Sequence, residues 1–267
     1  MNKLLTYCTL PLLLSVKLFA FSFTPVPKQL AAHYIAPSQN LQLLIGKLQN
    51  NGFTVLATTS ILKKYNVITI TNQELQNTNS YMATLQVNVA PNEVRVQNPS
   101  YLAAAYLGSA YRYGQFKKTV NALERSLGTL TNGFQKANFS TLANYHFMYG
   151  LPKKDDVLSI KKADKVIEKT STPSSKRYIA YVLTLPNGST LVGHKLRTKT
   201  YKFLELLGQE KNAQILPYEA MIKGDEVTIM NPKYYLSLSL PMLSLHEFMK
   251  IASIPDQIYR NIKKAYK

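Results

Sequence analysis

The sequence predicts an α+β fold of two tandem homologous domains, each an antiparallel sheet with packed helices. Three observations carry this prediction. The chain has 267 residues, enough for two domains of about 100–150 residues each. Paired β-branched segments flank turn residues, and these hairpin patterns alternate with amphipathic helix patterns. A ten-residue segment also occurs twice, at 92–101 and at 225–234, which indicates an internal repeat.

The first half begins with a strand pattern followed by an amphipathic helix pattern. Ser38 or Asn40 is suited to cap this helix, and Asn51 with Gly52 is suited to end it. Segments rich in β-branched residues then predict strands. The predicted elements are a strand at 30–36, a helix at 41–50, strands at 53–62 and 67–71, a hairpin of 81–89 with 94–97, and a helix at 115–130.

The second half repeats the hairpin pattern. Pro186, Asn187 and Gly188 are a strong turn signal between two apolar segments, and Pro255 is expected to break the last helix. We place the domain boundary near Gly150, which gives domains at 23–150 and 151–267. The predicted elements are strands at 178–185 and 190–196, a helix at 201–207, strands at 213–221 and 226–230, and a helix at 244–264.

Residues 1–22 have the pattern of a secretory signal peptide. Lys3 precedes an apolar core, and Ala20 and Ser22 match a small-x-small cleavage site. Lys17 interrupts the apolar run, which argues against a membrane span of about 20 apolar residues. An uncleaved anchor is the alternative. We therefore expect a periplasmic or secreted protein.

The repeated segment is a strand that ends in Asn-Pro. Asn is a preferred helix cap and Pro suits the first helical position, so the dipeptide predicts the start of a helix. The alternative is that free backbone N–H groups at this turn bind an anion, with two tyrosines lining the site. The corresponding residues of the two copies are Asn98 and Asn231, Pro99 and Pro232, and Tyr101 and Tyr234.

This strand with its Asn-Pro turn, together with Asn51 to Val55 after the first helix, resembles the bacterial family called domain of unknown function 302. The resemblance covers most of residues 29–130 and, more loosely, 178–264. It implies domains similar to the TATA-binding-protein fold, usually built as dimers, so that two copies in one chain form an internal pseudo-dimer. The second copy departs from the pattern, since it lacks a clear first strand and helix before Tyr178. The family implies no activity.

Positive charge dominates the composition. The chain has 32 Lys and Arg against 14 Asp and Glu, a formal net charge of +18. Lys195, Arg197 and Lys199 alternate, which on a strand places three cations on one face. Such a stripe is suited to phosphate, anionic lipid or an acidic partner. The alternative is a basic surface that keeps the protein soluble and weakly attracted to anionic membranes.

Cofactor chemistry has one weak candidate. His146 and Met148 lie two positions apart in an aromatic segment, and on a strand they would share a side and could ligate haem or copper. Aromatic packing between the domains is the alternative explanation that we favour. The single cysteine, Cys8, excludes an internal disulfide framework and a cysteine-bound cluster. We therefore predict no cofactor and no metal.

Together these patterns predict an exported, non-enzymatic binding or assembly module with an unknown ligand or protein partner. No catalytic motif gives a reason to propose an enzyme. The alternatives are a haem- or metal-binding redox accessory protein, and a binder of anionic lipid or nucleic acid through the basic strand. We expect no nucleic acid partner, because an exported protein rarely meets nucleic acid.

Overall fold

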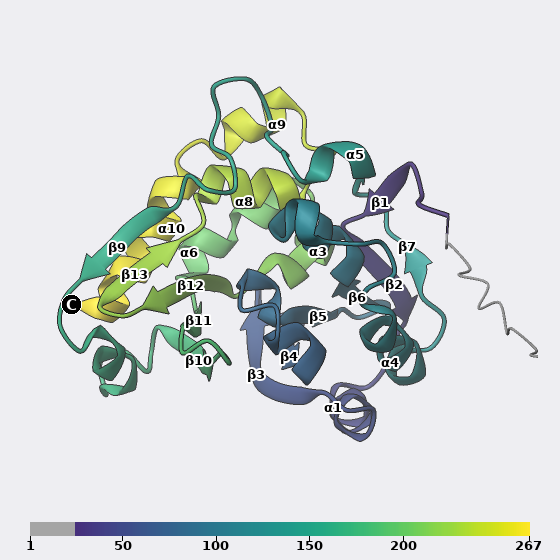
Figure 1. Ribbon diagram of the computed structural model, residues 1–267, viewed down its shortest axis with the longest axis horizontal. Helices are drawn as coiled ribbons and strands as arrows, with labels where there is room; N and C mark the ends of the chain where they lie inside the picture. Colours follow the sequence, from purple (N-terminus) through teal and green to yellow (C-terminus); the bar gives the residue numbers. More distant parts are fainter. Residues whose placement is uncertain (1–24) are drawn as a thin grey trace, which may run out of the picture.

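The computed structural model describes residues 25–267, so the signal segment predicted at residues 1–22 lies outside the described residues. Antiparallel sheets and surrounding helices form an α+β fold, as the sequence predicts (Figure 1). The first half of the chain lies on the right of Figure 1 and the end of the chain lies at the far left. Within residues 25–267, no helix has the length and apolar character needed to cross a membrane.

The first large sheet has six strands, and each pairs antiparallel with its neighbours. Asn40 caps helix α1 (Leu41–Asn50), as predicted, by accepting hydrogen bonds from the backbone N–H groups of Gln42 and Leu43. Leu44 and Leu48 of α1 are buried, and α1 packs against α4 (Lys117–Leu127). The order across the sheet is β3 (Thr54–Ile61), β4 (Tyr65–Thr71), β5 (Leu85–Val89), β6 (Glu93–Gln97), β2 (His33–Pro37) and β7 (Thr131–Asn132), with helices α1 (Leu41–Asn50), α2 (Gln73–Gln76), α3 (Pro99–Tyr106), α4 (Lys117–Leu127) and α5 (Phe139–Leu142), and with 3-10 helices η1 (Tyr81–Ala83) and η2 (Gly108–Ala110).

The strand predicted at 30–36 is two strands with different partners. β1 (Gln29–Ala31) pairs with β8 (Lys136–Asn138) in a small separate sheet, whereas β2 pairs with β6 and β7. The chain changes partner at Ala32, whose backbone N–H donates to the carbonyl of Gln135. Alternation of apolar residues does not report such a change of partner.

The second large sheet has five strands, again all antiparallel. The terminal helix predicted at 244–264 is two helices, α9 (Leu245–Lys250) and α10 (Ile254–Lys263). Pro255 lies in the first turn of α10, so the break predicted at this proline is confirmed. The order across the sheet is β10 (Ile179–Thr184), β11 (Thr190–His194), β12 (Tyr218–Lys223), β13 (Glu226–Ile229) and β9 (Leu158–Lys162), with helices α6 (Thr198–Tyr201), α7 (Phe203–Leu206), α8 (Pro232–Ser239), α9 (Leu245–Lys250) and α10 (Ile254–Lys263), and with 3-10 helices η3 (Val166–Ser171), η4 (Glu210–Ile215) and η5 (Lys264–Tyr266).

Five strands of each sheet follow the same order. In each half the first strand, β2 or β9, lies beside the fifth, and the second to fifth strands lie in chain order. The sequence led us to expect no clear first strand in the second half, and β9 corrects that expectation. Its sequence LSIKK is short and ends in two lysines, which hides the alternation of a strand. The helix that would follow it is only the 3-10 helix η3.

The two halves share one buried core. The cluster of buried apolar side chains includes residues of both sheets and of helices from both halves. Edge strand β3 of the first sheet contacts edge strand β10 of the second. We call the boundary where the two halves meet the seam. Polar contacts also cross it: the Tyr81 hydroxyl donates to the carbonyl of Thr228 over 3.1 Å, and the Gln86 amide lies 3.3 Å from the Glu219 carboxylate.

Candidate functional site

Both Asn-Pro turns begin a helix, which confirms the capping prediction. The Asn98 side-chain oxygen accepts a hydrogen bond from Ser100 N over 2.9 Å, and Asn231 accepts one from Lys233 N over 3.1 Å. Each turn follows the fifth strand of its half, and each helix has eight residues with Pro in its first turn. Gln86 and Glu219, which meet across the seam, are 133 positions apart, as are Asn98 and Asn231.

The tyrosines of the repeated segment are buried in the core. Tyr101 is buried and its hydroxyl donates to the carbonyl of Leu238 over 2.7 Å. Tyr234 is buried beside the ring of Tyr145, at a centroid distance of 6.2 Å. Burial raises the pKa of both hydroxyls above their usual range. The tyrosines therefore do not line an anion site at these turns.

The second turn does border a surface pocket of about 400 Å³. Asn231, Pro232 and Lys233 line it together with Asp256 and Tyr259. Lys233 and Asp256 bring opposite charges to this pocket, so their side chains together give it no net positive charge to attract an anion. Capping is thus a sufficient reason for the dipeptide.

Replacing the capping asparagines is expected to lower stability. Loss of a polar cap costs about 0.5–2 kcal/mol, and we expect Asn231→Ala to fall in this range. Asn98→Ala should cost more than Asn231→Ala, because Asn98 is buried and also donates to the carbonyl of Ala31 over 2.8 Å. Urea unfolding of both variants measures this. Unchanged midpoints in both variants would contradict the capping role.

The predicted stripe of Lys195, Arg197 and Lys199 is wrong in its geometry. Strand β11 ends at His194, and the chain turns so that Arg197 precedes α6 and Lys199 lies within it. Leu196, between Lys195 and Arg197, enters the core. Lys195 is exposed after the end of the strand, so the three cations do not share a strand face.

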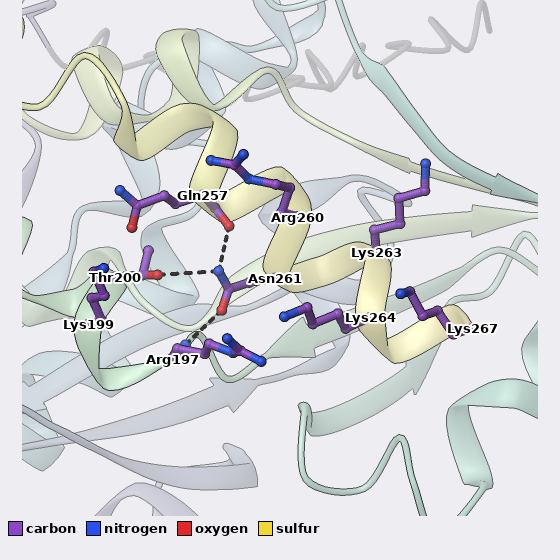
Figure 2. A pocket seen from close by; sticks show the side chains of 9 residues that line it. All are labelled: Arg197, Lys199, Thr200, Gln257, Arg260, Asn261, Lys263, Lys264 and Lys267. Atoms are coloured by element: carbon purple, nitrogen blue, oxygen red, sulfur yellow. Dashed lines mark hydrogen bonds between the residues drawn. The ribbon is translucent and has the colours of Figure 1, made fainter.

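Arg197 and Lys199 instead join the end of the chain around a basic pocket of about 520 Å³. Six of its nine lining residues are cationic, and none carries a carboxylate side chain. Figure 2 shows the loop before α6 and residue Lys199 facing α10 and η5 across this pocket. We name these residues the basic pocket: Arg197, Lys199, Thr200, Gln257, Arg260, Asn261, Lys263, Lys264 and Lys267.

Asn261 holds the two sides of the basic pocket together. Its side-chain oxygen accepts from Arg197 N over 3.0 Å, and its amide donates to the Thr200 hydroxyl over 3.3 Å and to the Gln257 carbonyl over 2.5 Å (Figure 2). Asn261 and Thr200 are both buried. Within η5, the hydroxyl of buried Tyr266 lies 3.0 Å from the imidazole of His194. The cations are therefore carried on a fixed frame.

The basic pocket holds six positive charges that no acidic side chain neutralises within the described part of the chain. Among residues 25–267, none of the six cations forms a salt bridge, although three such bridges occur elsewhere. Arg260 and Lys263 have a structural reason to be here, because cations stabilise the C-terminal end of a helix. The same reason applies to Lys199 in the last turn of α6, but it does not extend to Arg197, which precedes that helix. Cations that converge from two separate segments of the chain attract anions.

The segment with His146 and Met148 is not a strand. Residues 145–146 have no regular secondary structure and 147–150 form bends and turns, so the two side chains do not share a strand face. His146 is exposed, with its Nδ1 atom 3.1 Å from the carbonyl of Asn144. Its aromatic neighbours pack instead: the ring of Phe147 lies 4.9 Å from that of Phe248. In the described part of the chain, no three His, Cys, Asp or Glu residues gather as metal ligands would.

Reasoning from the sequence missed the helical contribution to the basic pocket. Arg260, Lys263, Lys264 and Lys267 follow the spacing of one helix face, which is a readable signal. The contact of Asn261 with Thr200 joins residues 61 positions apart, and no local sequence pattern predicts it. Comparison of the chain with protein-family models, with curated proteins and with solved structures finds no match.

Proposed function

We propose that this chain is a non-enzymatic binding module whose ligand is a multiply charged oxyanion of the phosphate type. The observation that carries the proposal is the basic pocket, where six cations from two separate segments of the chain line a cavity without a carboxylate side chain. Arginine and lysine donors on a fixed frame suit phosphate oxygens. Export to the periplasm or beyond remains part of the proposal and rests on the pattern of residues 1–22 alone.

We also infer that the module arose by duplication and forms an internal pseudo-dimer, as the resemblance to the domain of unknown function 302 family implies. Three facts support this. The strand order is shared between the large sheets, and the equivalent edge strands β3 and β10 contact each other. Gln86 and Glu219, equivalent by the offset of 133, meet at the seam. In a dimer with two-fold symmetry, equivalent residues meet near the axis in this way. The likeness to the TATA-binding-protein fold stays a proposal of the same kind.

Pyrophosphate is the probe that tests the anion site. We expect it to bind the wild-type protein and the double variant Arg197→Gln with Arg260→Gln to bind it about tenfold more weakly, since a hydrogen bond to a charged group is worth about 1.5–3 kcal/mol and exposure reduces this. Isothermal titration calorimetry at constant ionic strength measures the affinity. The change at Arg197 spares its backbone N–H, which holds Asn261.

A matched control separates this site from the overall charge. Lys117 and Lys118 are exposed at the start of α4, so Lys117→Gln with Lys118→Gln removes the same charge on another element. We expect this control to bind pyrophosphate as the wild type does. Equal weakening in both double variants would contradict a defined site and favour diffuse attraction to a basic surface.

A further inference from the structure

We propose that the basic pocket is the polar part of a surface that docks on an anionic phospholipid bilayer. This inference rests on the proposed function, because it identifies the phosphate groups as lipid headgroups. It depends on what adjoins the basic pocket. A second pocket, of about 410 Å³, shares Lys199 and Gln257 with the first, so the two form one continuous surface across α6, α7 and α10.

The second pocket differs from the first in being amphipathic. Three apolar side chains, Phe203, Leu206 and Ile254, line it. Two further lysines, Lys202 and Lys250, line it as well. We name this second set of residues the amphipathic pocket: Lys199, Lys202, Phe203, Glu205, Leu206, Lys250, Ser253, Ile254 and Gln257.

Leu206 is the apolar side chain that the amphipathic pocket presents to solvent. It is 61% exposed, whereas Phe203 and Ile254 are buried. Met249, which precedes Lys250 in α9, is 62% exposed. A single exposed leucine is ordinary on a protein surface. Here it stands among lysines whose flexible stems can keep the charge at the headgroups while apolar atoms enter the acyl boundary.

Charge complementarity favours a bilayer as the occupant. Eight cations line the two pockets against one carboxylate side chain, that of Glu205. Anionic leaflets attract basic clusters of this size near the surface. A small soluble phosphate compound would use the basic pocket alone, whereas a bilayer would contact both pockets and the exposed Leu206 together.

Nucleic acid fits this surface less well. Proteins that bind single strands stack bases on accessible aromatic side chains, and readers of single-stranded RNA do the same. Phe203 is the aromatic residue among those lining the two pockets, and it is fully buried. The aromatic residues Tyr111 and Phe116, elsewhere in the chain, are also buried and stack on each other. The surface thus offers charge and an aliphatic side chain, as an anionic bilayer requires.

Sedimentation with lipid vesicles tests the inference. We expect the protein to sediment with phosphatidylcholine vesicles that contain phosphatidylglycerol and to stay in solution with phosphatidylcholine alone. Lys202→Gln with Lys250→Gln should lower the partition coefficient about tenfold or more, because each basic residue near an anionic leaflet contributes a factor of about five. Leu206→Ser should lower it several-fold at high salt, where charge attraction is screened. Lys117→Gln with Lys118→Gln, the same charge change on α4, should have a much smaller effect.

The outcomes distinguish this inference from the proposed function. Pyrophosphate binding without vesicle binding would overturn the bilayer and leave the anion site standing. Absence of both pyrophosphate binding and vesicle binding would overturn the anion site and the bilayer inference together. Equal partitioning of wild type and Leu206→Ser would overturn the apolar contact with the bilayer. Tighter binding to a single-stranded oligonucleotide than to anionic vesicles at the same salt concentration would overturn the inference in favour of nucleic acid.

Discussion

Gly193→Ala is expected to lower the free energy of unfolding by about 3 kcal/mol, the upper part of the range for overpacking a core. Gly193 lies in the buried strand β11, and the ring of Tyr181 on the neighbouring strand β10 covers its Cα. An added Cβ would overlap ring carbons of Tyr181, of which Cε1 is the nearest. The ring would have to leave its position, because real Cβ atoms do not tolerate such contacts.

The Tyr181 ring cannot move without a second loss. Its hydroxyl donates to the Glu219 carboxylate, which also accepts from the Thr84 hydroxyl. Tyr181 and Thr84 are buried. Displacing the ring breaks its hydrogen bond to this carboxylate, and a hydrogen bond to a charged group contributes about 1.5–3 kcal/mol. We therefore place the effect of Gly193→Ala at the high end.

Urea unfolding measures this effect, and Gly46→Ala is its control. Gly46 lies within helix α1, and an added Cβ there meets no atom within 4 Å. Ala is favoured over Gly in a helix by about 1 kcal/mol, so Gly46→Ala should raise the midpoint. Two glycine-to-alanine changes in one chain should thus shift stability in opposite directions. A wild-type midpoint for Gly193→Ala would show that the Tyr181 ring is not held as described.

Local patterns in the sequence were sufficient to predict the start of each repeated helix. Asn98 and Asn231 cap helices because the dipeptide Asn-Pro combines a cap with the first helical position. Gln86 and Glu219 also lie at equivalent positions, but their meeting at the seam depends on how two sheets pack. Tertiary packing of this kind has no periodic signature along the chain.

In the candidate site, too, some features were predicted from the sequence and others depend on tertiary packing. Arg197 and Lys199 were identified from their charge, but their arrangement on a strand was wrong because β11 ends at His194 and Lys199 lies within α6. The cations of α10 and η5 complete the basic pocket only because Asn261 fastens α10 to the start of α6. Residue type thus predicted the chemistry of the site, whereas long-range hydrogen bonds determined its composition.

Glu219→Gln is expected to make stability less sensitive to pH. Burial raises the pKa of the Glu219 carboxyl from 4.5 to about 7, and the hydrogen bonds from Thr84 and Tyr181 act in the opposite direction. Since the folded pKa lies above the unfolded one, this group contributes stability that is fully present below pH 4.5 and is lost as the pH rises to about 7. The loss above pH 7 amounts to about 3 kcal/mol, because one pKa unit corresponds to about 1.4 kcal/mol.

Two buried histidines change stability in the opposite direction. Burial, aided by Arg95, lowers the pKa of His33 to about 3, and burial lowers that of His194 to about 4. Their contribution is present above pH 6.5 and is lost as the pH falls towards these values. The pH profile of the wild type alone therefore mixes opposing contributions. Subtracting it from the profile of Glu219→Gln removes the histidine contributions, since both proteins contain them.

The difference between the two profiles is the measured quantity. We expect the free energy of unfolding of Glu219→Gln minus that of the wild type to be constant below about pH 4.5 and to rise by about 3 kcal/mol by pH 8. The glutamine keeps an oxygen that accepts from Tyr181 and Thr84, so the variant retains the hydrogen bonds of the seam. Burial holds the pKa of Tyr181 well above its usual range, so Tyr181 does not titrate in this window. A difference that stays flat from pH 4 to pH 8 would mean that the Glu219 carboxyl is ionised in the folded protein at an ordinary pKa.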